Sequence, residues 1–203
     1  MKKILIYVFS AVIVLSGGLS VFAFISTPEH LDVNLTIVRA PDQTETEWPV
    51  GIPNPLDNII ALPDTPNLAL NRPVAVSSVT ETFIGRNAVD GELLSYWESN
   101  GFPGVLTVEL DGVRNIQTVA LGLNPSALWE PRSQTFEVQI SQDGNNFTTI
   151  TPEERHDFHP DTGNTVRIDF NPTAARYVRF VFTANSAART NGAQVAEVMI
   201  FEG

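Results

Sequence analysis

Short stretches of alternating apolar and polar residues dominate the chain from Asn67 onward. Phe136, Val138 and Ile140 alternate with polar residues, and Asp143-Gly144 then supplies the turn of a hairpin over 135–150. The other expected strands cover 105–110, 115–123, 165–170, 175–184 and 195–201, with a turn at 111–114. No window here shows a long helical stripe with caps, so the pattern predicts an antiparallel sandwich or barrel.

The first 26 residues form a different kind of segment. Lys2 and Lys3 precede the apolar run 4–15, and SGGLSVFA (16–23) ends in small residues, as a secretory signal does. The alternative is an uncleaved membrane anchor, because the 22 residues from Ile4 to Ile25 carry no charge. Both interpretations place the rest of the chain outside the cytoplasm, either secreted or membrane-anchored.

Residues 27–66 are expected to be a spacer, because their prolines remove backbone donors and oppose regular elements. Two short apolar islands, 35–38 and 59–62, are expected to dock on the following domain, which covers 67–203. Trp48 is interpreted as a docking or linker aromatic residue rather than a ligand contact.

Composition limits the partners. The chain has 12 Lys and Arg against 23 Asp and Glu, a net charge of −11, which argues against nucleic acid or an anionic lipid surface. Neutral sugars and divalent cations remain compatible with that charge. The absence of Cys excludes disulfides, thiolate zinc sites and Cys nucleophiles.

The stretch NAVDGELLSYWES (87–99) carries the residue types of a cation-binding loop. Asp90 supplies a carboxylate, Ser95 a hydroxyl, and Gly91 permits a tight turn that aims carbonyls inward, which suits Ca²⁺. A plain Asp-Gly surface turn stays open as the alternative. Trp97 is expected in the core, since a large apolar ring beside a strand is usually buried.

Six pieces of the chain, in order, resemble a known family. They are NLALNRPVAVSS, NAVDGELLSYWES, VLTVELDGVRNIQTVAL, FEVQISQDGNNF, ARYVRFVF and VAEVMIFEG. Together they resemble the coagulation factor V/VIII C-type (discoidin) domain, and especially the galactose-binding-like carbohydrate-binding modules. The resemblance implies an all-β fold, an antiparallel jelly-roll β-sandwich over 67–203.

The resemblance also implies a structural calcium site. In that family Ca²⁺ commonly lies between the first Asp-Gly loop and an Ala-Glu pair near the C-terminus, away from the sugar. Carried over to this chain, the ligands are the carboxylates of Asp90 and Glu197, the hydroxyl of Ser95, and main-chain carbonyls of Asn87, Glu92, Ser95 and Ala196. Seven oxygens and two negative charges suit Ca²⁺.

Trp129 and Arg132 are the candidate sugar contacts, in a variable loop over 123–136. An aromatic plate and a rigid fork of donors are what sugar recognition needs, and the family often places an Arg five residues before this Glu-Val pair. The alternative is that Arg132 pairs with a nearby carboxylate and Trp129 caps the core edge. Two further loops are expected at the same rim, with Glu81, Phe83 and Arg86 in one and Asn185, Arg189 and Asn191 in the other.

Two histidines in ERHDFHPDTG (154–163) have metal-ligand chemistry. Strand spacing would put His156 and His159 on different sides of the chain, and Pro160 with Gly163 marks a loop, so a solvated loop is expected. The histidine that many sugar-binding relatives use in the early loop is not visible, which weakens a specific prediction of galactose.

These observations predict an extracytoplasmic, non-catalytic carbohydrate-binding module whose partner is a glycan or glycoprotein. No catalytic carboxylate pair, nucleophile elbow or phosphate loop is found. The alternative is a discoidin-type adhesion module that binds a protein, with lipid disfavoured by the acidic charge. The membrane is a partner only through an uncleaved N-terminal segment, and the oligomeric state stays open.

Overall fold

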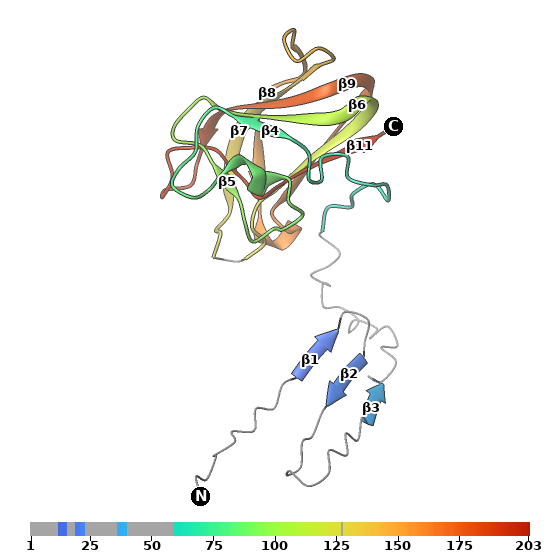
Figure 1. The fold of residues 1–203 in the computed structure, drawn as a ribbon. Helices are drawn as coiled ribbons and strands as arrows, with labels where there is room; N and C mark the ends of the chain where they lie inside the picture. Colours follow the sequence, from blue (N-terminus) through green and yellow to red (C-terminus); the bar gives the residue numbers. More distant parts are fainter. Residues whose placement is uncertain (1–11, 16–18, 23–35, 40–58, 127) are drawn as a thin grey trace, which may run out of the picture. The chain divides into compact units, whose positions relative to one another are not determined.

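The computed structural model describes residues 12–15, 19–22, 36–39, 59–126 and 128–203 (Figure 1). The chain divides into two compact units, Met1–Ile52 and Pro53–Gly203. Within the described residues, no helix is both long enough and apolar enough to cross a membrane.

The first unit contains a three-stranded antiparallel sheet of β1 (Val12–Leu15), β2 (Leu19–Phe22) and β3 (Thr36–Arg39). β1 and β2 fall in the expected signal or anchor segment, whose cleavage stays a prediction. β3 lies in the proline-rich stretch, so the expectation that no regular element forms there is wrong at this point. The sequence TIVR is β-favouring and lies between the prolines rather than on one. Trp48 and most of the expected spacer lie outside the described residues.

The second unit is built almost wholly from antiparallel strands. The main sheet has the order β11-β6-β9-β7-β8, with β4 also paired to β6, while β5 and β10 form a separate ladder. This confirms the all-β, antiparallel sandwich. Its elements are β4 (Val74–Val76), the 3-10 helix η2 (Gly85–Ala88), β5 (Trp97–Glu98), β6 (Gly104–Gly122), β7 (Arg132–Ser141), β8 (Thr148–Phe158), the 3-10 helix η3 (Pro160–Thr162), β9 (Thr165–Asn185), β10 (Gln194–Val195) and β11 (Glu197–Glu202).

Two very long strands replace two pairs of expected ones. The predicted strands 105–110 and 115–123 are halves of β6, and 165–170 and 175–184 are halves of β9. The predicted turn at 111–114 is instead an irregularity within β6, where the register shifts between Glu109 and Arg114. Such bulges bend a strand without ending it, which lets one strand serve both layers of a sandwich.

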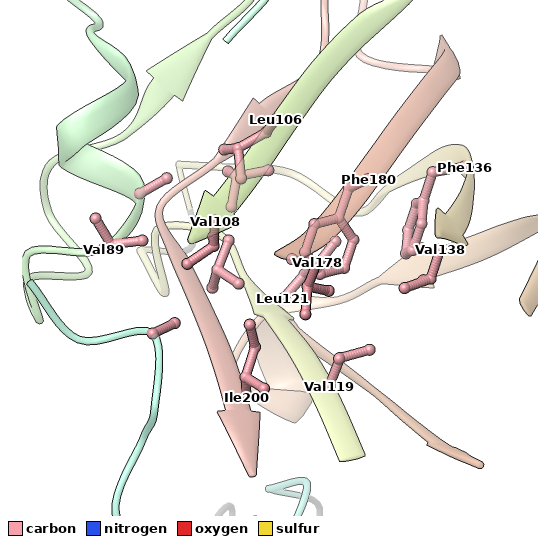
Figure 2. Close-up of a cluster of buried hydrophobic side chains, with 14 of the residues drawn as sticks. Val89, Leu106, Val108, Val119, Leu121, Phe136, Val138, Val178, Phe180 and Ile200 are labelled. Atoms are coloured by element: carbon pink, nitrogen blue, oxygen red, sulfur yellow. The ribbon is translucent and has the colours of Figure 1, made fainter. Parts of the chain in front are cut away.

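The core lies between the halves of these bent strands. Leu106 and Val108 come from the first half of β6, and Val119 and Leu121 from the second. Figure 2 shows them gathered in one cluster with Ile200 of β11. All five side chains are at most 1% exposed, so one continuous core supports every loop at the end of the sandwich.

The β7–β8 hairpin forms where the sequence predicts it. Gly144 has φ of 77°, which other residues resist. The Asp143 carboxylate accepts hydrogen bonds from the amides of Asn145 and Asn146, and these bonds hold the pKa of Asp143 well below its usual range. The turn therefore fixes the register of the two strands.

The residues just before the sandwich are fastened to it. Arg167 of β9 donates a 2.6 Å hydrogen bond to the carbonyl of Ala61, so the apolar island 59–62 docks as expected. Asn67 accepts a hydrogen bond from the Ile200 amide and donates to the Val198 carbonyl. The start of the domain is thereby tied to its last strand, β11.

Candidate functional site: a rim cluster beside a carboxylate loop

A two-residue ladder joins distant parts of the domain. Gln194 and Val195 of β10 pair with Glu98 and Trp97 of β5. Trp97 is 0% exposed and its indole Nε1 donates a 3.0 Å hydrogen bond to the Ser78 carbonyl, which confirms its predicted place in the core. Because side chains alternate along a strand, Tyr96 and Glu98 lie on the opposite side from Trp97.

The loop before β5 is closed by its own side chains. The Asp90 carboxylate accepts hydrogen bonds from the Glu92 amide (2.9 Å) and the Ser95 hydroxyl (2.8 Å). Ser95 also lies 3.2 Å from the Glu92 carbonyl. Asn87 donates from its side chain to the Tyr96 carbonyl at 3.0 Å, which fixes the exit of the loop. Several oxygens are therefore gathered within a few residues.

Glu197 meets this loop from the far end of the chain. Its carboxylate is 4% exposed and accepts hydrogen bonds from the Gly91 amide at 3.0 Å and from the side chain of Asn67 at 3.3 Å. Burial raises the pKa of Glu197, the Gly91 hydrogen bond lowers it and the neighbouring charges of Asp90 and Glu92 raise it, and together these effects place it at about 7. The arrangement concentrates negative charge, and among the described residues no cationic side chain is bonded to Glu197.

These oxygens fit a hard divalent cation. The group consists of carboxylates, a hydroxyl and carbonyls, which is the ligand set of Ca²⁺ rather than of zinc. Within the described ranges, no cluster of three or more His, Cys, Asp or Glu side chains is placed to hold a metal. An ion bound here would therefore need main-chain carbonyls in addition to Asp90 and Glu197.

A second cluster lies on the other side of β5 and is aromatic. The rings of Phe83 and Tyr96 stack with centroids 4.3 Å apart, and Tyr96 meets Trp129 edge-on at 4.8 Å. The guanidinium carbon of Arg132 lies 4.7 Å from the Trp129 ring centroid. We call these four residues the rim cluster. Three separate loops therefore contribute to one continuous patch.

Buried polar groups fix the position of Arg132. Its Nη1 donates to the side-chain oxygen of Gln194 at 2.7 Å, and its Nε donates to the Glu130 carbonyl at 3.2 Å. Gln194 in turn donates through Nε2 to Glu98 at 2.8 Å, and Thr190 donates to the other Glu98 oxygen at 2.8 Å. A network of this kind holds a side chain in one geometry before any ligand arrives.

Gln134 anchors the same network from below. It is 0% exposed, its Nε2 donates to the main-chain carbonyl of Gln194, and its oxygen accepts from the Gln194 amide, both at 2.8 Å. The backbone of β10 is thus bonded on both sides, to β5 and to Gln134. The position of Gln194, and through it Arg132, is set by the rigid part of the domain.

A depression of about 530 Å³ opens beside Arg132. Its lining includes Arg132, Gln194, Arg189, Thr190 and Glu130, with Leu128 at the edge. Burial lowers the pKa of Arg132, which shows that part of its hydration is lost. This volume lies within the usual range of small-molecule sites.

Comparison with known proteins identifies the architecture. The sequence model of the F5/8 type C domain matches residues 73–198. The chain belongs to this family. No curated protein matches the chain.

Several solved structures of similar fold are carbohydrate-binding modules. CpGH89CBM32-5 from Clostridium perfringens, in complex with GalNAc-beta-1,3-galactose, is 25% identical with a TM-score of 0.57, over 67% of this chain and 99% of that one. Chitosan-binding module 1 of a chitosanase/glucanase from Paenibacillus sp. IK-5, a selenomethionine-labelled mutant, is 26% identical with a TM-score of 0.55, over 66% and 96%. The CBM32 of AlyQ, in complex with 4,5-unsaturated mannuronic acid, shares the fold at 23% identity and a TM-score of 0.54, over 64% and 95%.

The F5/8 type C fold brings most of the predicted residues together. Asp90, Glu92, Ser95 and Glu197 lie in one group, and Asn87 and Ala196 adjoin it in sequence and structure. Ala196 is 0% exposed, and its amide donates to the Gly122 carbonyl. The metal itself stays a prediction.

The residues predicted at the rim lie in four different settings. Trp129, Arg132 and Phe83 share the rim cluster, and Glu81 lies near enough that its charge, after burial and Glu98, raises the pKa of Tyr96. Arg189 lines the depression, and Asn191 is exposed in the same loop. Arg86 instead borders a different depression beside Arg72 and Val74. Asn185 bonds the Gly192 carbonyl and so shapes the loop.

Sequence reasoning missed Tyr96, Glu98 and Gln194. Tyr96 and Glu98 could have been found from the alternation of side chains in SYWES. Once Trp97 is assigned to the core, Tyr96 and Glu98 must point to the opposite side of the strand. Gln194 had no such signal, because its role depends on pairing with a segment 96 positions away.

The histidine segment also differs from expectation. His156 lies in β8 rather than in a solvated loop, and its ring stacks on Phe136 with centroids 4.3 Å apart. Its Nε2 is buried without a hydrogen-bond partner, and burial lowers the pKa of His156. The sequence does not predict this stacking, because Phe136 lies on a different strand, the neighbouring β7. His159 is half-exposed and caps η3.

The family resemblance implies a calcium site away from the sugar, which stays a prediction. In the structure the loop that contains Asp90, Glu92 and Ser95, here called the carboxylate loop, adjoins the rim cluster. Ser95 and Tyr96 are consecutive, and Gln194 and Glu197 are separated by two residues. Both groups are held by the β5–β10 ladder. They are neighbours that share the same two segments.

Proposed function

We propose that this chain is a non-catalytic carbohydrate-binding module and that the rim cluster is its sugar site. The observation that carries the proposal is the placement of Arg132 over Trp129 by the buried Gln194–Glu98 network. Such a preformed pair of an aromatic ring and a donor fork costs little ordering on binding.

Each part of the rim cluster has a distinct role in this proposal. Trp129 and Tyr96 offer apolar ring surface to the C–H face of a sugar. The guanidinium donors of Arg132 left free by Gln194 and the Glu130 carbonyl reach vicinal hydroxyls. Glu81 and Asn191, both exposed, border the site and add polar contacts. Phe83 supports Tyr96 from behind by stacking.

The comparisons support a sugar ligand. Two solved relatives at 25% and 26% identity are named for binding GalNAc-beta-1,3-galactose and chitosan, respectively. Glycans or glycoproteins outside the cytoplasm are accordingly the partners we propose, with the N-terminal segment acting as a signal or an anchor. The family model covers residues 73–198.

We also assign a structural calcium ion to the carboxylate loop. Asp90 and Glu197 would supply the charge, and Ser95 with the carbonyls of Asn87, Glu92 and Ala196 the remaining oxygens. The raised pKa of Glu197 supports this assignment, because a divalent cation would offset the repulsion from Asp90 and Glu92. The ion would tie Asp90 to Glu197, which are 107 positions apart, and its role is stability rather than chemistry.

A glycan array with the full chain tests the sugar site. Trp129→Ala should remove the signal that the wild type gives. Phe147→Ala is the matched control, because Phe147 is also a half-buried aromatic ring beneath an arginine, Arg179, but borders a different depression. If the wild type binds no glycan at high concentration, the proposal is wrong and a protein-binding adhesion module becomes the better interpretation.

A further inference from the structure

Asn164 is a buried polar residue in the turn between η3 and β9. Its exposed fraction is 0%, and its backbone has a left-handed φ of 51°, directly after Gly163, whose φ is 73°. Residues other than glycine are uncommon in this region, and asparagine enters it more readily than most. The Asn164 amide donates a 2.9 Å hydrogen bond to the carbonyl of His159, which holds the residue to its own turn.

Two main-chain groups at the start of the loop between β6 and β7 are bonded to Asn164. Its carbonyl accepts a 2.9 Å hydrogen bond from the Leu123 amide, and its side-chain Nδ2 donates a 2.7 Å bond to the carbonyl of Asn124, 40 positions earlier in the chain. The side-chain Oδ1 is buried and has no hydrogen-bond partner among the described residues. Because an unpaired buried acceptor costs free energy, the side chain contributes through what Nδ2 holds.

From Asn124 a path of hydrogen bonds continues to Trp129. The side-chain oxygen of Asn124 accepts from the Ser126 amide at 2.9 Å, and the carbonyl of Ser126 accepts from the Trp129 amide, also at 2.9 Å. These later bonds join residues of the same exposed or half-buried loop. Local bonds of this kind open easily unless the base of the loop is fixed, and Asn164 supplies that fixed base.

We propose that Asn164 is a positioning residue of the sugar site, because it fixes the loop that places Trp129 against Tyr96. The inference rests on the proposed function and adds to it a residue outside the rim cluster. The two main contacts of the site then have separate supports, since Gln194 holds Arg132 and Asn164 holds the Trp129 loop. A binding loop that is already ordered loses less freedom when the sugar arrives, so the affinity is higher.

Hydrogen–deuterium exchange of the full chain, measured by mass spectrometry, tests the role without any ligand. Asn164→Gly removes the side-chain amide, and glycine adopts the left-handed backbone without strain. Amides within 123–131 should exchange about tenfold faster than in the wild type, while those of β7 and of 105–110 keep their rates. Asn71→Gly is the matched control, since Asn71 also has a left-handed φ, 57°, and is exposed.

A second variant keeps the test independent of how well Asn164→Gly folds. Asn124→Ala breaks the next bond of the path, from the Ser126 amide, at a half-buried position. It should also accelerate exchange within 123–131 and leave the core strands unchanged. If both variants leave exchange in 123–131 as in the wild type, or raise it equally throughout the domain, Asn164 does not position this loop.

Calorimetric titration with the strongest glycan of the array connects the loop to binding. Well below its melting temperature, Asn164→Gly should bind about five- to tenfold more weakly than the wild type, and Asn71→Gly should bind equally well. Unchanged affinity in Asn164→Gly overturns the positioning role but leaves the sugar site in place. Failure of the wild type to bind any glycan refutes the proposed function, and the role of Asn164 in a sugar site with it, whatever the exchange experiment shows.

Discussion

The amide of Gly91 donates a 3.0 Å hydrogen bond to the carboxylate of Glu197, across 106 positions of sequence. This contact closes an early loop onto the last strand and places a buried carboxylate next to Asp90 and Glu92. It makes the loop and the C-terminal strand one structural unit.

Calcium should stabilise the domain. At a concentration one hundred times the dissociation constant, binding adds about 2.7 kcal/mol to the free energy of unfolding. For a domain of this size we expect the melting temperature to rise by roughly 4–10 °C. Differential scanning calorimetry with calcium and with a chelator measures the shift.

Glu197→Gln should abolish that calcium shift because it removes one of the two carboxylates. Glu92→Gln is the control, since Glu92 is exposed and is assigned only a carbonyl contact. If the melting temperature of Glu197→Gln rises with calcium as much as that of the wild type, the proposed calcium site at Glu197 is wrong.

Calcium should also strengthen sugar binding. The β5–β10 ladder joins the carboxylate loop to the rim cluster, and Asn87 bonds the carbonyl of Tyr96 itself. Ordering the loop therefore orders Tyr96, and a coupling of about fivefold in affinity is expected. Calorimetric titration of one glycan with calcium and with chelator checks this. Identical affinities in a sample whose melting temperature does respond to calcium would show that the two sites are independent.

Gly192 should not tolerate a side chain. A Cβ atom there would collide with the main-chain carbonyl of Ser99, which packs directly against it. Gly192→Ala should lower the free energy of unfolding by about 3 kcal/mol, because overpacked backbone must move. Gly112→Ala is the matched control, since a Cβ at Gly112 meets nothing within 4 Å. Urea denaturation of both variants measures the difference, and equal midpoints would contradict the close packing of Gly192 against the Ser99 backbone.

His156 should make the domain less stable in mild acid. Burial lowers its pKa below the ordinary value of 6.5, so the unfolded chain takes up the proton first. The stability contributed by neutral His156 is fully present above the unfolded pKa and is lost as the pH falls through the folded pKa.

Comparison of wild type with His156→Phe isolates the effect of His156, because phenylalanine keeps the stacking on Phe136 without titrating. As the pH falls from about 7.5 to about 5.5, a range that brackets the ordinary histidine pKa of about 6.5, the wild type should lose stability relative to the variant. A wild-type-to-variant difference that is flat over this range would contradict the assignment.

Local pattern determined much of this fold in advance. Alternation at Phe136, Val138 and Ile140 and the Asp143-Gly144 turn predicted the hairpin, because both signals lie within one short segment. The long bent strands β6 and β9 were not predicted, since a turn and a bulge have the same local sequence signal at 111–114. Only pairing with a partner strand distinguishes the two.

The candidate site likewise contains residues that the sequence predicts and residues that only the structure reveals. Trp129 and Arg132 were found from residue type and spacing, and they are in contact. The groups that hold Arg132, namely Gln194, Glu98 and Gln134, come from three segments that meet only in the folded chain. No periodicity or motif in a single sequence carries that information, so the network could be described only from the structure.

The central claim is that Arg132, held by Gln194, binds the sugar. Calorimetric titration of the strongest array glycan against Arg132→Gln tests it most directly. Loss of a charged donor predicts an affinity about ten- to a hundredfold weaker. The matched Arg179→Gln variant, whose arginine also lies over an aromatic ring, should bind like wild type. An Arg132→Gln protein that folds and binds with unchanged affinity would contradict the claim.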